Sequence, residues 1–274
     1  MVVACFGDLG LDVIVRLEQP LARGADTRSR VSLHPGGQAA NVAAWVAVLG
    51  GRARLIAKRG SDDAGRVVDA RLAAFGVEVV GPLGTGRGGV IVSLVGADGE
   101  RSMCSDRGVA VDFHPDELDP GWLSGCDHLH VSSYALAREP VRAAATRAIA
   151  IARRNGARVS IDLSSWSVIR DVGPSAFRAA VAMLDPDVVF ANEEEDEIVG
   201  GPISGPAWIL KRGPSGCSFD GDERAPAPTD RVVDTTGAGD ALAAGWIVGG
   251  PDLALQAAAR CVGHTGAMPP TADA

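Results

Sequence analysis

The residues best suited to chemistry lie near the end of the chain, where small residues and an acid precede an alanine-rich apolar stretch. Gly237, Ala238 and Gly239 leave their backbone N–H groups unblocked, and such groups at the start of a helix favour an anion. Asp240 would stand beside that anion. An anion hole next to a base is what phosphoryl transfer from ATP to an alcohol requires. The structural alternative is an Asp240 that only stabilises its own helix.

Five short motifs follow one another along the chain in a fixed order. They are Gly7-Asp8-Leu9-Gly10-Leu11-Asp12, Gly36-Gly37-Gln38-Ala39-Ala40-Asn41, Asn192-Glu193-Glu194-Glu195, Lys211-Arg212-Gly213-Pro214-Ser215-Gly216 and Gly237-Ala238-Gly239-Asp240. In this order they resemble the signatures of the ribokinase-like family of carbohydrate kinases, also called the PfkB family. The resemblance spans nearly the whole chain, and the ordered set is specific although each motif alone is not.

The resemblance implies a kinase that moves the γ-phosphate of ATP to a hydroxyl of a small sugar or sugar acid, with Asp240 as general base and residues 237–239 as the anion hole. The implied sugar ligands are Asp12, Gly36, Gly37 and Asn41. Diglycine lets a backbone approach a substrate closely, and a carboxylate and an amide can bind neighbouring hydroxyls. Without the family, Asp12 is interpreted equally well as a turn residue, and Asn41 as an amide on a helix surface.

The resemblance also implies where the nucleotide binds. The implied nucleotide contacts are Lys211, Gly213 and Gly216, with Gly263 and His264 as candidates for contact with adenine. The chain departs from the family pattern in a bulky Trp246 and in a short segment after Cys261. That segment is where the family completes the adenine pocket.

Two pairs of residues resemble the family's cation ligands. Asn192 and Glu195 are implied to organise Mg²⁺, which prefers oxygen ligands and keeps several waters, so that part of the contact would run through water. The two glutamates between them are interpreted as a solvated, acidic helix start. Asp234 and Thr236 resemble ligands of an activating monovalent cation such as K⁺.

The elements that must position these residues alternate along the chain. The predicted strands include Val2–Phe6, Arg54–Ala57, Leu129–Val131, Val159–Asp162, Val188–Ala191 and Trp208–Leu210. The predicted helices include Ala39–Leu49, Asp62–Phe75 and Pro140–Asn155, each followed by a glycine. This alternation predicts an α/β fold with a mostly parallel central sheet and helices on both faces.

Two segments interrupt the alternation. Residues 11–31 and 89–104 read as strands with no helix between them, and the second contains Asp98-Gly99, a strong hairpin-turn signal. We predict that these strands form a small β lid on one kinase domain spanning residues 1–274. Because strands at a sheet edge have unpaired backbone groups that two lids would bury, we expect a homodimer through the lid.

The composition limits the partners and the compartment. A formal net charge of −8 disfavours nucleic acid, whose phosphates require basic patches. No apolar run approaches the ~18–20 residues of a membrane span. The five cysteines are scattered and form no CxxC pair, which is typical of the reducing cytoplasm. The opening run Val2–Cys5 is interpreted as a buried strand rather than a lipoprotein cleavage box.

Three other signals are set aside. Residues 84–89 satisfy GxGxxG, but a predicted strand follows them instead of the helix that a dinucleotide site needs, so an NAD oxidoreductase is not supported. His128 and His130 point to one side of a strand without a third metal ligand in view, which favours packed histidines. Ser164-Ser165 lies outside any GxSxG elbow of a hydrolase.

The substrate stays open within the kinase class. Arg107, after the predicted lid hairpin, either pairs with a substrate carboxylate or phosphate or is a solvated lid residue. A nucleoside kinase on the same fold is one alternative, although one Tyr and six Phe make the supply of aromatic side chains thin. A catalytically weak sensor of sugar or nucleotide is another, and the presence of Asp240 with Asn192 and Glu195 argues against it.

Overall fold

The computed structural model describes residues 1–96 and 100–270, and its largest element is a mostly parallel sheet. The strands of this sheet are β1 (Val2–Phe6), β4 (Arg52–Ile56), β6 (Glu78–Val80), β10 (His128–Ser132), β11 (Arg158–Asp162), β12 (Val188–Asn192), β13 (Ala207–Lys211), β14 (Cys217–Phe219) and β15 (Asp222–Arg224). Among the described residues their order is β15-β14-β13-β12-β11-β10-β1-β4-β6. Neighbours from β6 to β13 are parallel, and β14 and β15 form an antiparallel edge.

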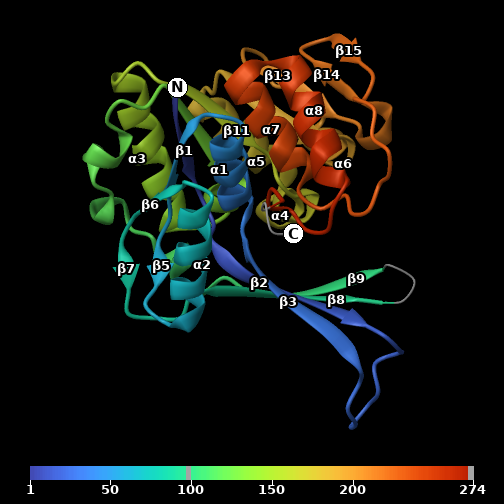
Figure 1. Cartoon of the computed structure of the whole chain (residues 1–274). Coiled ribbons are helices and arrows are strands. Elements are labelled where there is room, and N and C mark those ends of the chain that lie inside the picture. Colours follow the sequence, from blue (N-terminus) through green and yellow to red (C-terminus); the bar gives the residue numbers. More distant parts are fainter. Residues whose placement is uncertain (97–99, 271–274) are drawn as a thin grey trace.

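Helices cover both faces of this sheet, because successive side chains of a strand point to opposite faces. Val3 and Cys5 pack on the face covered by α1 (Gln38–Val48), α2 (Asp63–Ala74), α7 (Ala238–Gly249) and α8 (Pro251–Val262). Ala4 and Phe6 pack on the face covered by α3 (Val141–Arg154), α4 (Trp166–Val172), α5 (Pro174–Leu184) and α6 (Glu193–Val199). The predicted α/β class, with helices on both faces, is confirmed (Figure 1).

The two segments that interrupt the alternation form a second sheet, which we call the small sheet. Its strands in spatial order are β3 (Ser29–Gly36), β2 (Gly10–Leu17), β8 (Gly89–Val95) and β9 (Arg101–Asp106), counted over the described residues. In Figure 1 the outer ends of these strands project away from the large sheet and its helices.

The small sheet reaches further along the chain than predicted. β3 continues past Val31 to Gly36, because Gly36 pairs with Gly10 at the start of β2, and β9 continues to Asp106. The predicted turn at Asp98-Gly99 lies outside the described residues. Strand β5 (Arg59–Gly60) pairs with β7 (Leu83–Gly84), and β8 rather than a helix follows the glycine-rich run 84–89, as predicted.

Helices α1 and α7 occupy the core and bring their first turns together. In α1 every residue from Gln38 to Val46 is buried, and the Trp45 indole Nε1 donates a 2.8 Å hydrogen bond to the carbonyl of Ala267. α7 packs closely on α8, since a Cβ at Gly245 would lie 2.6 Å from the carbonyl oxygen of Leu253. Burial on nearly all sides explains why the sequence of α7 is apolar with no polar stripe.

The remaining elements are short, and two further expectations can be compared with the structure. The 3₁₀ turns are Gly108–Asp112, Pro115–Glu117, Pro120–Leu123, Ser133–Leu136 and Gly213–Ser215. All five cysteines are free thiols.

Within residues 1–96 and 100–270 we find no helix with the length and apolar character needed to cross a membrane.

Candidate active site

Polar side chains gather at the carboxyl ends of the parallel strands. Asp8 follows β1, while Asp162, Asn192 and Lys211 are the last residues of β11, β12 and β13. Carboxyl ends of parallel strands share one edge of the sheet. The strand order changes direction between β1 and β10, and open α/β sheets bind ligands at the carboxyl side of such a point.

The first turn of α7 meets this edge. Lys211 Nζ lies 3.3 Å from the position of a Cβ on Gly239. Gly237, the N-cap of α7, has φ 78°, and a Cβ there would lie 2.5 Å from Cα of Ala267. Both the left-handed backbone and the close approach require glycine. The helix start therefore presents backbone rather than side chains to the pocket, in a place where the dipole favours an anion.

Asp240 lies in the first turn of α7, as the sequence predicts, and contacts α1. Asn41 Nδ2 donates a 2.7 Å hydrogen bond to Asp240 Oδ2. Loss of water on burial, together with the carboxylates of Asp162 and Asp8, raises the pKa of Asp240 from 3.8 to about 7, although Asn41 and Lys211 oppose the rise. A carboxyl group with a pKa near neutrality suits a general base.

Asp12 and the predicted diglycine also meet. A Cβ at Gly36 would lie 2.3 Å from both carboxylate oxygens of Asp12, so the carboxylate rests on the bare backbone of β3. At Gly37, φ is 103° and a Cβ would lie 2.5 Å from the carbonyl oxygen of Asp8. Burial, together with the neighbouring Asp8 carboxylate, raises the pKa of Asp12 to about 7.

Unsatisfied hydrogen-bond acceptors surround this group. Among the described residues, buried side-chain oxygens without a hydrogen-bond partner include Asp8 Oδ1, Gln38 Oε1 and Asn41 Oδ1. Buried acceptors without partners are costly and are normally paired. Three such oxygens lie near Asp240 and Asp12, so a ligand with several hydrogen-bond donors, such as a polyol, would satisfy them.

Arg107 lies beside the same acidic group. Its Nη1 is 3.2 Å from Asp8 Oδ2, and its guanidinium carbon lies 4.0 Å from the centroid of the Tyr134 ring. The ion pair and the cation–π contact fix a planar donor whose side chain is one-third exposed. The structure thus brings Arg107 and Asp12 next to Asp8, and Asn41 next to Asp240, although Arg107, Asp12 and Asn41 come from three separate parts of the chain.

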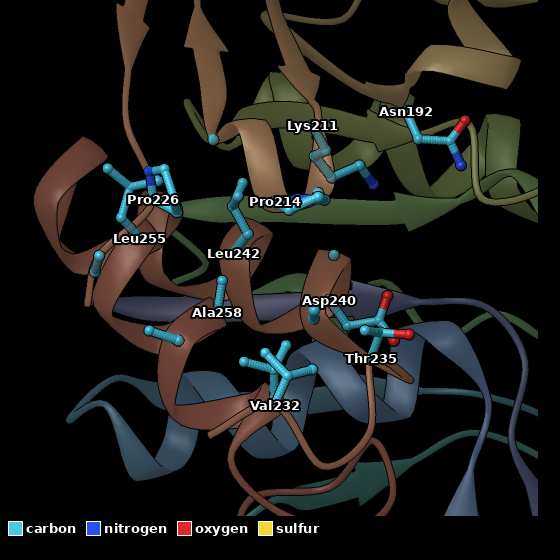
Figure 2. A pocket seen from close by; sticks show the side chains of 18 of the residues that line it. Asn192, Lys211, Pro214, Pro226, Val232, Thr235, Asp240, Leu242, Leu255 and Ala258 are labelled. Atoms are coloured by element: carbon cyan, nitrogen blue, oxygen red, sulfur yellow. The ribbon is translucent and has the colours of Figure 1, made fainter. Parts of the chain in front are cut away.

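Asp240 also lines a cavity of about 690 Å³. Its polar end holds Asn192, Lys211 and Asp240, and Figure 2 shows Leu255 among the apolar side chains at the end away from them. Val232 lines the cavity closer to Asp240. The remaining apolar lining includes Pro214, Pro226, Leu242 and Ala258. An apolar slot that leads to a polar end suits a flat ring joined to a charged chain.

The predicted nucleotide residues divide into two groups. Lys211, Gly213 and Gly216 line the cavity. Gly263 and His264 are not among its lining residues, whereas the preceding Val262 is. The ring nitrogens of His264 lie 2.7 Å from the carbonyl oxygen of Met268 and 3.1 Å from that of Arg260. Contact of Gly263 and His264 with adenine stays a prediction.

Asn192 and Glu195 engage each other in a capping box at the start of α6. Asn192 Oδ1 accepts from Glu195 N at 2.8 Å, and Glu195 Oε2 accepts from Asn192 N at 2.9 Å. Burial raises the pKa of Glu195 to about 7, although Lys211 opposes the rise. Both side chains face the polar end of the cavity with hard oxygen atoms, and because these atoms already hold partners they fit a magnesium ion contacted through water.

Asp234 and Thr236, the residues resembling monovalent-cation ligands, are joined directly. Asp234 Oδ1 accepts hydrogen bonds from Thr236 N at 2.9 Å and Thr236 Oγ1 at 2.7 Å, and Asp234 Oδ2 accepts from Gly266 N at 3.0 Å. The carboxylate thus connects the loop before α7 to the segment after α8. Among the described residues no cluster of three or more His, Cys, Asp or Glu side chains forms a metal site.

His128 and His130 are packed histidines, as predicted. Ser160 Oγ lies 2.8 Å from His128 Nε2 and 2.9 Å from His130 Nδ1. Burial lowers the pKa of both imidazoles, to about 3 and about 4 respectively. His130 Nε2 lies 3.4 Å from Gln38 Nε2, which leaves the Gln38 carbonyl oxygen for the site.

Sequence reasoning missed Asp8, Gln38, Tyr134 and Asp162. Asp8 and Gln38 stand inside the recognised motifs but were passed over in favour of Asp12 and Asn41. Asp162 was treated as a strand end only. A useful signal was present, because a polar residue at the carboxyl end of a buried parallel strand lies where α/β sheets bind ligands.

Comparison with known proteins shows the family of the chain. The model of the family described as "pfkB family carbohydrate kinase" matches residues 2–268. The ATP-dependent ribose-1-phosphate kinase of Halopiger xanaduensis is 33% identical over 292 aligned residues, which cover 98% of this chain and 94% of that protein.

Solved structures show the same fold. An adenosine kinase from Sinorhizobium meliloti superposes with a TM-score of 0.85 at 24% identity, over 98% of this chain and 95% of that one. A protein described as a ribokinase II from E. coli, in complex with ATP and Mg²⁺, gives 0.81 at 24% identity, over 97% and 94%. The family match and the ribose-1-phosphate kinase together establish that the chain belongs to the pfkB family of carbohydrate kinases.

Proposed function

We propose that the protein transfers the γ-phosphate of ATP to a hydroxyl of a small sugar, with Asp240 as general base and residues 237–239 as the anion hole. The observation that carries this proposal is the position of Asp240. It lies in the first turn of α7 and lines the cavity, and Asn41, whose own Oδ1 is unsatisfied, holds its carboxylate at 2.7 Å.

The proposed step moves one proton and one phosphoryl group. Asp240 accepts the proton of the attacking hydroxyl, whose oxygen bonds to the γ-phosphorus of ATP. The bond between this phosphorus and the oxygen that bridges to the β-phosphate breaks, and ADP leaves. Backbone N–H groups of residues 237–239 meet the charge that develops on the phosphoryl oxygens, and donors of this kind contribute ~3–4 kcal/mol each.

Cations would assist at two places. Mg²⁺, contacted through water by Asn192 and Glu195, would neutralise charge on the phosphate oxygens. A monovalent cation at Asp234 and Thr236 is proposed from the resemblance. This second cation is tested by comparing ATP binding and turnover in K⁺ with those in choline at one ionic strength.

The sugar would lie on the Asp12 side of Asp240. Asp12, Asn41 and the backbone at Gly36 and Gly37 offer acceptors and close approach to hydroxyls, as the unsatisfied oxygens require. Arg107 adds a planar cation suited to a carboxylate or a phosphate. The Halopiger relative acts on ribose-1-phosphate, which supports a phosphorylated pentose among the acceptors to be tested.

The small sheet is proposed as the lid of one kinase domain. It carries Asp12 on β2 and leads into Arg107 after β9, so its position determines where two sugar ligands stand. Exclusion of water by such a lid would strengthen the electrostatic interactions beneath it. Val31 and Leu33 are exposed on one face of the small sheet, which supports pairing of two lids in a homodimer. Sedimentation at several protein concentrations tests this proposal.

The experiment that tests the activity is ADP release by purified protein with Mg-ATP and a panel of acceptors. The panel holds ribose-1-phosphate, ribose, fructose, a 2-keto-3-deoxy sugar acid and adenosine. Turnover with a sugar supports the proposal, whereas turnover with adenosine alone favours a nucleoside kinase. No turnover, despite a ligand-dependent rise in Tm, would favour a sensor.

Arg107→Gln is expected to separate charged from neutral acceptors. Loss of a charge-assisted, bidentate contact costs about 1.5–3 kcal/mol, so the KM for an anionic sugar should rise by roughly 10- to 100-fold, while that for a neutral sugar changes little. Steady-state kinetics with both acceptors measure this difference. Arg87→Gln is the control, because Arg87 is an exposed neighbour paired with Asp106. Equal effects on both acceptors would contradict a role in recognising charge.

Gly36→Ala is expected to impair sugar binding without unfolding the protein. The added methyl would displace the Asp12 carboxylate, and overpacking of this kind costs about 1–3 kcal/mol, or roughly a tenfold rise or more in sugar KM. Gly263→Ala is the matched control, since its Cβ would meet nothing closer than 3.4 Å. An unchanged sugar KM in Gly36→Ala would remove Asp12 from the sugar site.

A further inference from the structure

A buried ion pair connects two strands below the start of α7. Lys211 Nζ on β13 donates to Asp162 Oδ2 on β11 at 2.8 Å, across the intervening strand β12. The side chains are 13% and 1% exposed. Both residues are at the carboxyl ends of their strands and both line the cavity.

The Asp162 carboxylate is held in place by its second oxygen. Asp162 Oδ1 accepts from Ser164 N at 2.9 Å, and Ser164 Oγ donates to the Asp162 carbonyl at 2.8 Å. Ser164 has a left-handed backbone with φ 61°, which these two contacts stabilise. Because both carboxylate oxygens hold structural partners, Asp162 is suited to orienting a cation rather than to accepting a substrate proton.

Lys211 is thereby aimed at the anion hole. Its Nζ lies 3.3 Å from the position of a Cβ on Gly239, so the ammonium group lies against the backbone of the first turn of α7. A lysine side chain is flexible and takes many rotamers when nothing fixes its end. Glu195 also attracts Lys211 electrostatically and would compete for the ammonium if Asp162 were absent.

We propose that Asp162 is a positioning residue that holds the Lys211 ammonium beneath residues 237–239, where it meets the transferring phosphoryl group. The proposal rests on the proposed phosphoryl transfer. Asp162 contacts no reacting atom and acts through Lys211. The arrangement gives the anion hole one fixed positive charge in addition to its backbone N–H groups.

The pair also affects the base. The groups that act on Asp240 are Asp162 from β11, Lys211 from β13, Asn41 from α1 and Asp8 after β1. Removing the charge of Asp162 should lower the pKa of Asp240 and move the acidic limb of the kcat profile to lower pH. Removing the charge of Lys211 should move that limb to higher pH. A carboxylate whose charge did not act on Asp240 would move the limb in neither direction.

The test is a double-mutant cycle with Asp162→Asn and Lys211→Met, read as kcat and as the pH profile of kcat. Asp162→Asn keeps the acceptor for Ser164 N but loses the charge and the acceptor for Lys211 Nζ. Loss of one preorganised donor costs ~10²- to 10³-fold, so each single variant should lose kcat on this scale, and the double variant should lose little more. Asp162→Glu is a second variant in case Asp162→Asn does not fold. Because it keeps the negative charge, its kcat should fall while the acidic limb of its kcat profile stays unmoved.

Lys58→Met and Glu117→Gln are the controls. Lys58 Nζ lies 2.7 Å from Glu117 Oε1, and these two residues line no part of the cavity. Their variants should change Tm but not kcat. Three results would overturn the proposal. They are losses of kcat that multiply in the double variant, a wild-type kcat in Asp162→Asn or Asp162→Glu, and an unmoved acidic limb in the kcat profile of Asp162→Asn. An inactive wild-type protein would overturn the proposed function together with this inference, whereas the other results leave that function intact.

Discussion

Asp240→Asn lowers kcat by at least ~10²-fold at pH 8, the loss expected when a positioned base is removed. The introduced side chain keeps an oxygen that accepts from Asn41 Nδ2 but cannot take up the hydroxyl proton. In the wild-type protein kcat should fall below about pH 7, because Asp240, whose pKa is raised to about 7, is protonated there. Initial rates between pH 5 and 9 measure both effects.

The same variant should be at least as stable as the wild-type protein. The pKa of Asp240 is raised from 3.8 to about 7 on folding, so the folded state binds more protons between these values. The free energy of unfolding therefore decreases as pH rises through this window, and the whole cost is present above pH 7. An amide avoids that cost, so Tm should rise relative to wild type at pH 8 but not at pH 4.

The control for both measurements is Asp171→Asn. Asp171 is an exposed carboxylate paired with the adjacent Arg170, far from the cavity lining. It should change neither kcat nor the pH dependence of Tm. If Asp240→Asn retained most of its kcat, another group would have to be the base.

Trp45→Ala is expected to give the largest loss of stability, about 3–5 kcal/mol. The Trp45 side chain is fully buried in α1, and its removal leaves a cavity together with an unpaired carbonyl at Ala267. For a chain of this size the loss corresponds to a fall in Tm of roughly 10 °C. Urea unfolding followed by circular dichroism measures the free energy.

Trp45→Phe separates packing from hydrogen bonding. It keeps much of the ring volume but loses the bond to Ala267, which contacts Gly237. We expect a smaller loss of stability but weaker ATP binding, because the segment that supports the N-cap of α7 is released. Trp166→Ala is the control, since Trp166 is 43% exposed and should cost much less. Equal losses in Trp45→Ala and Trp166→Ala would contradict this account.

The sequence predicted the sheet and the main motifs because both depend on local patterns. The strands around Val3 and Val189 are short apolar runs, and the turn before Asp240 consists of small residues in an unusual order. Asp8 and Asp162 were missed because their roles depend on strand order. β11 lies two strands from β13, and no local pattern places Asp162 next to Lys211.

The C-terminal segment is hard to predict for a similar reason. Gly263 and His264 follow α8 closely in sequence, but no local pattern predicts that His264 contacts the carbonyl of Met268. The boundary of the small sheet was missed because β3 passes directly into α1 at the diglycine. The predicted segment ends at Val31, and pairing with β2 extends the strand to Gly36.

The chain has two lysines, Lys58 and Lys211. The side chain of each is mostly buried and forms an ion pair with a carboxylate. Reagents that acylate amines should therefore react slowly with either side chain while the protein is folded. The rate at which each becomes labelled would report how often its surroundings open, one near Glu117 and the other at the anion hole. If bound nucleotide slows the acylation of Lys211, the acylation rate of this lysine would measure how much of the site is occupied.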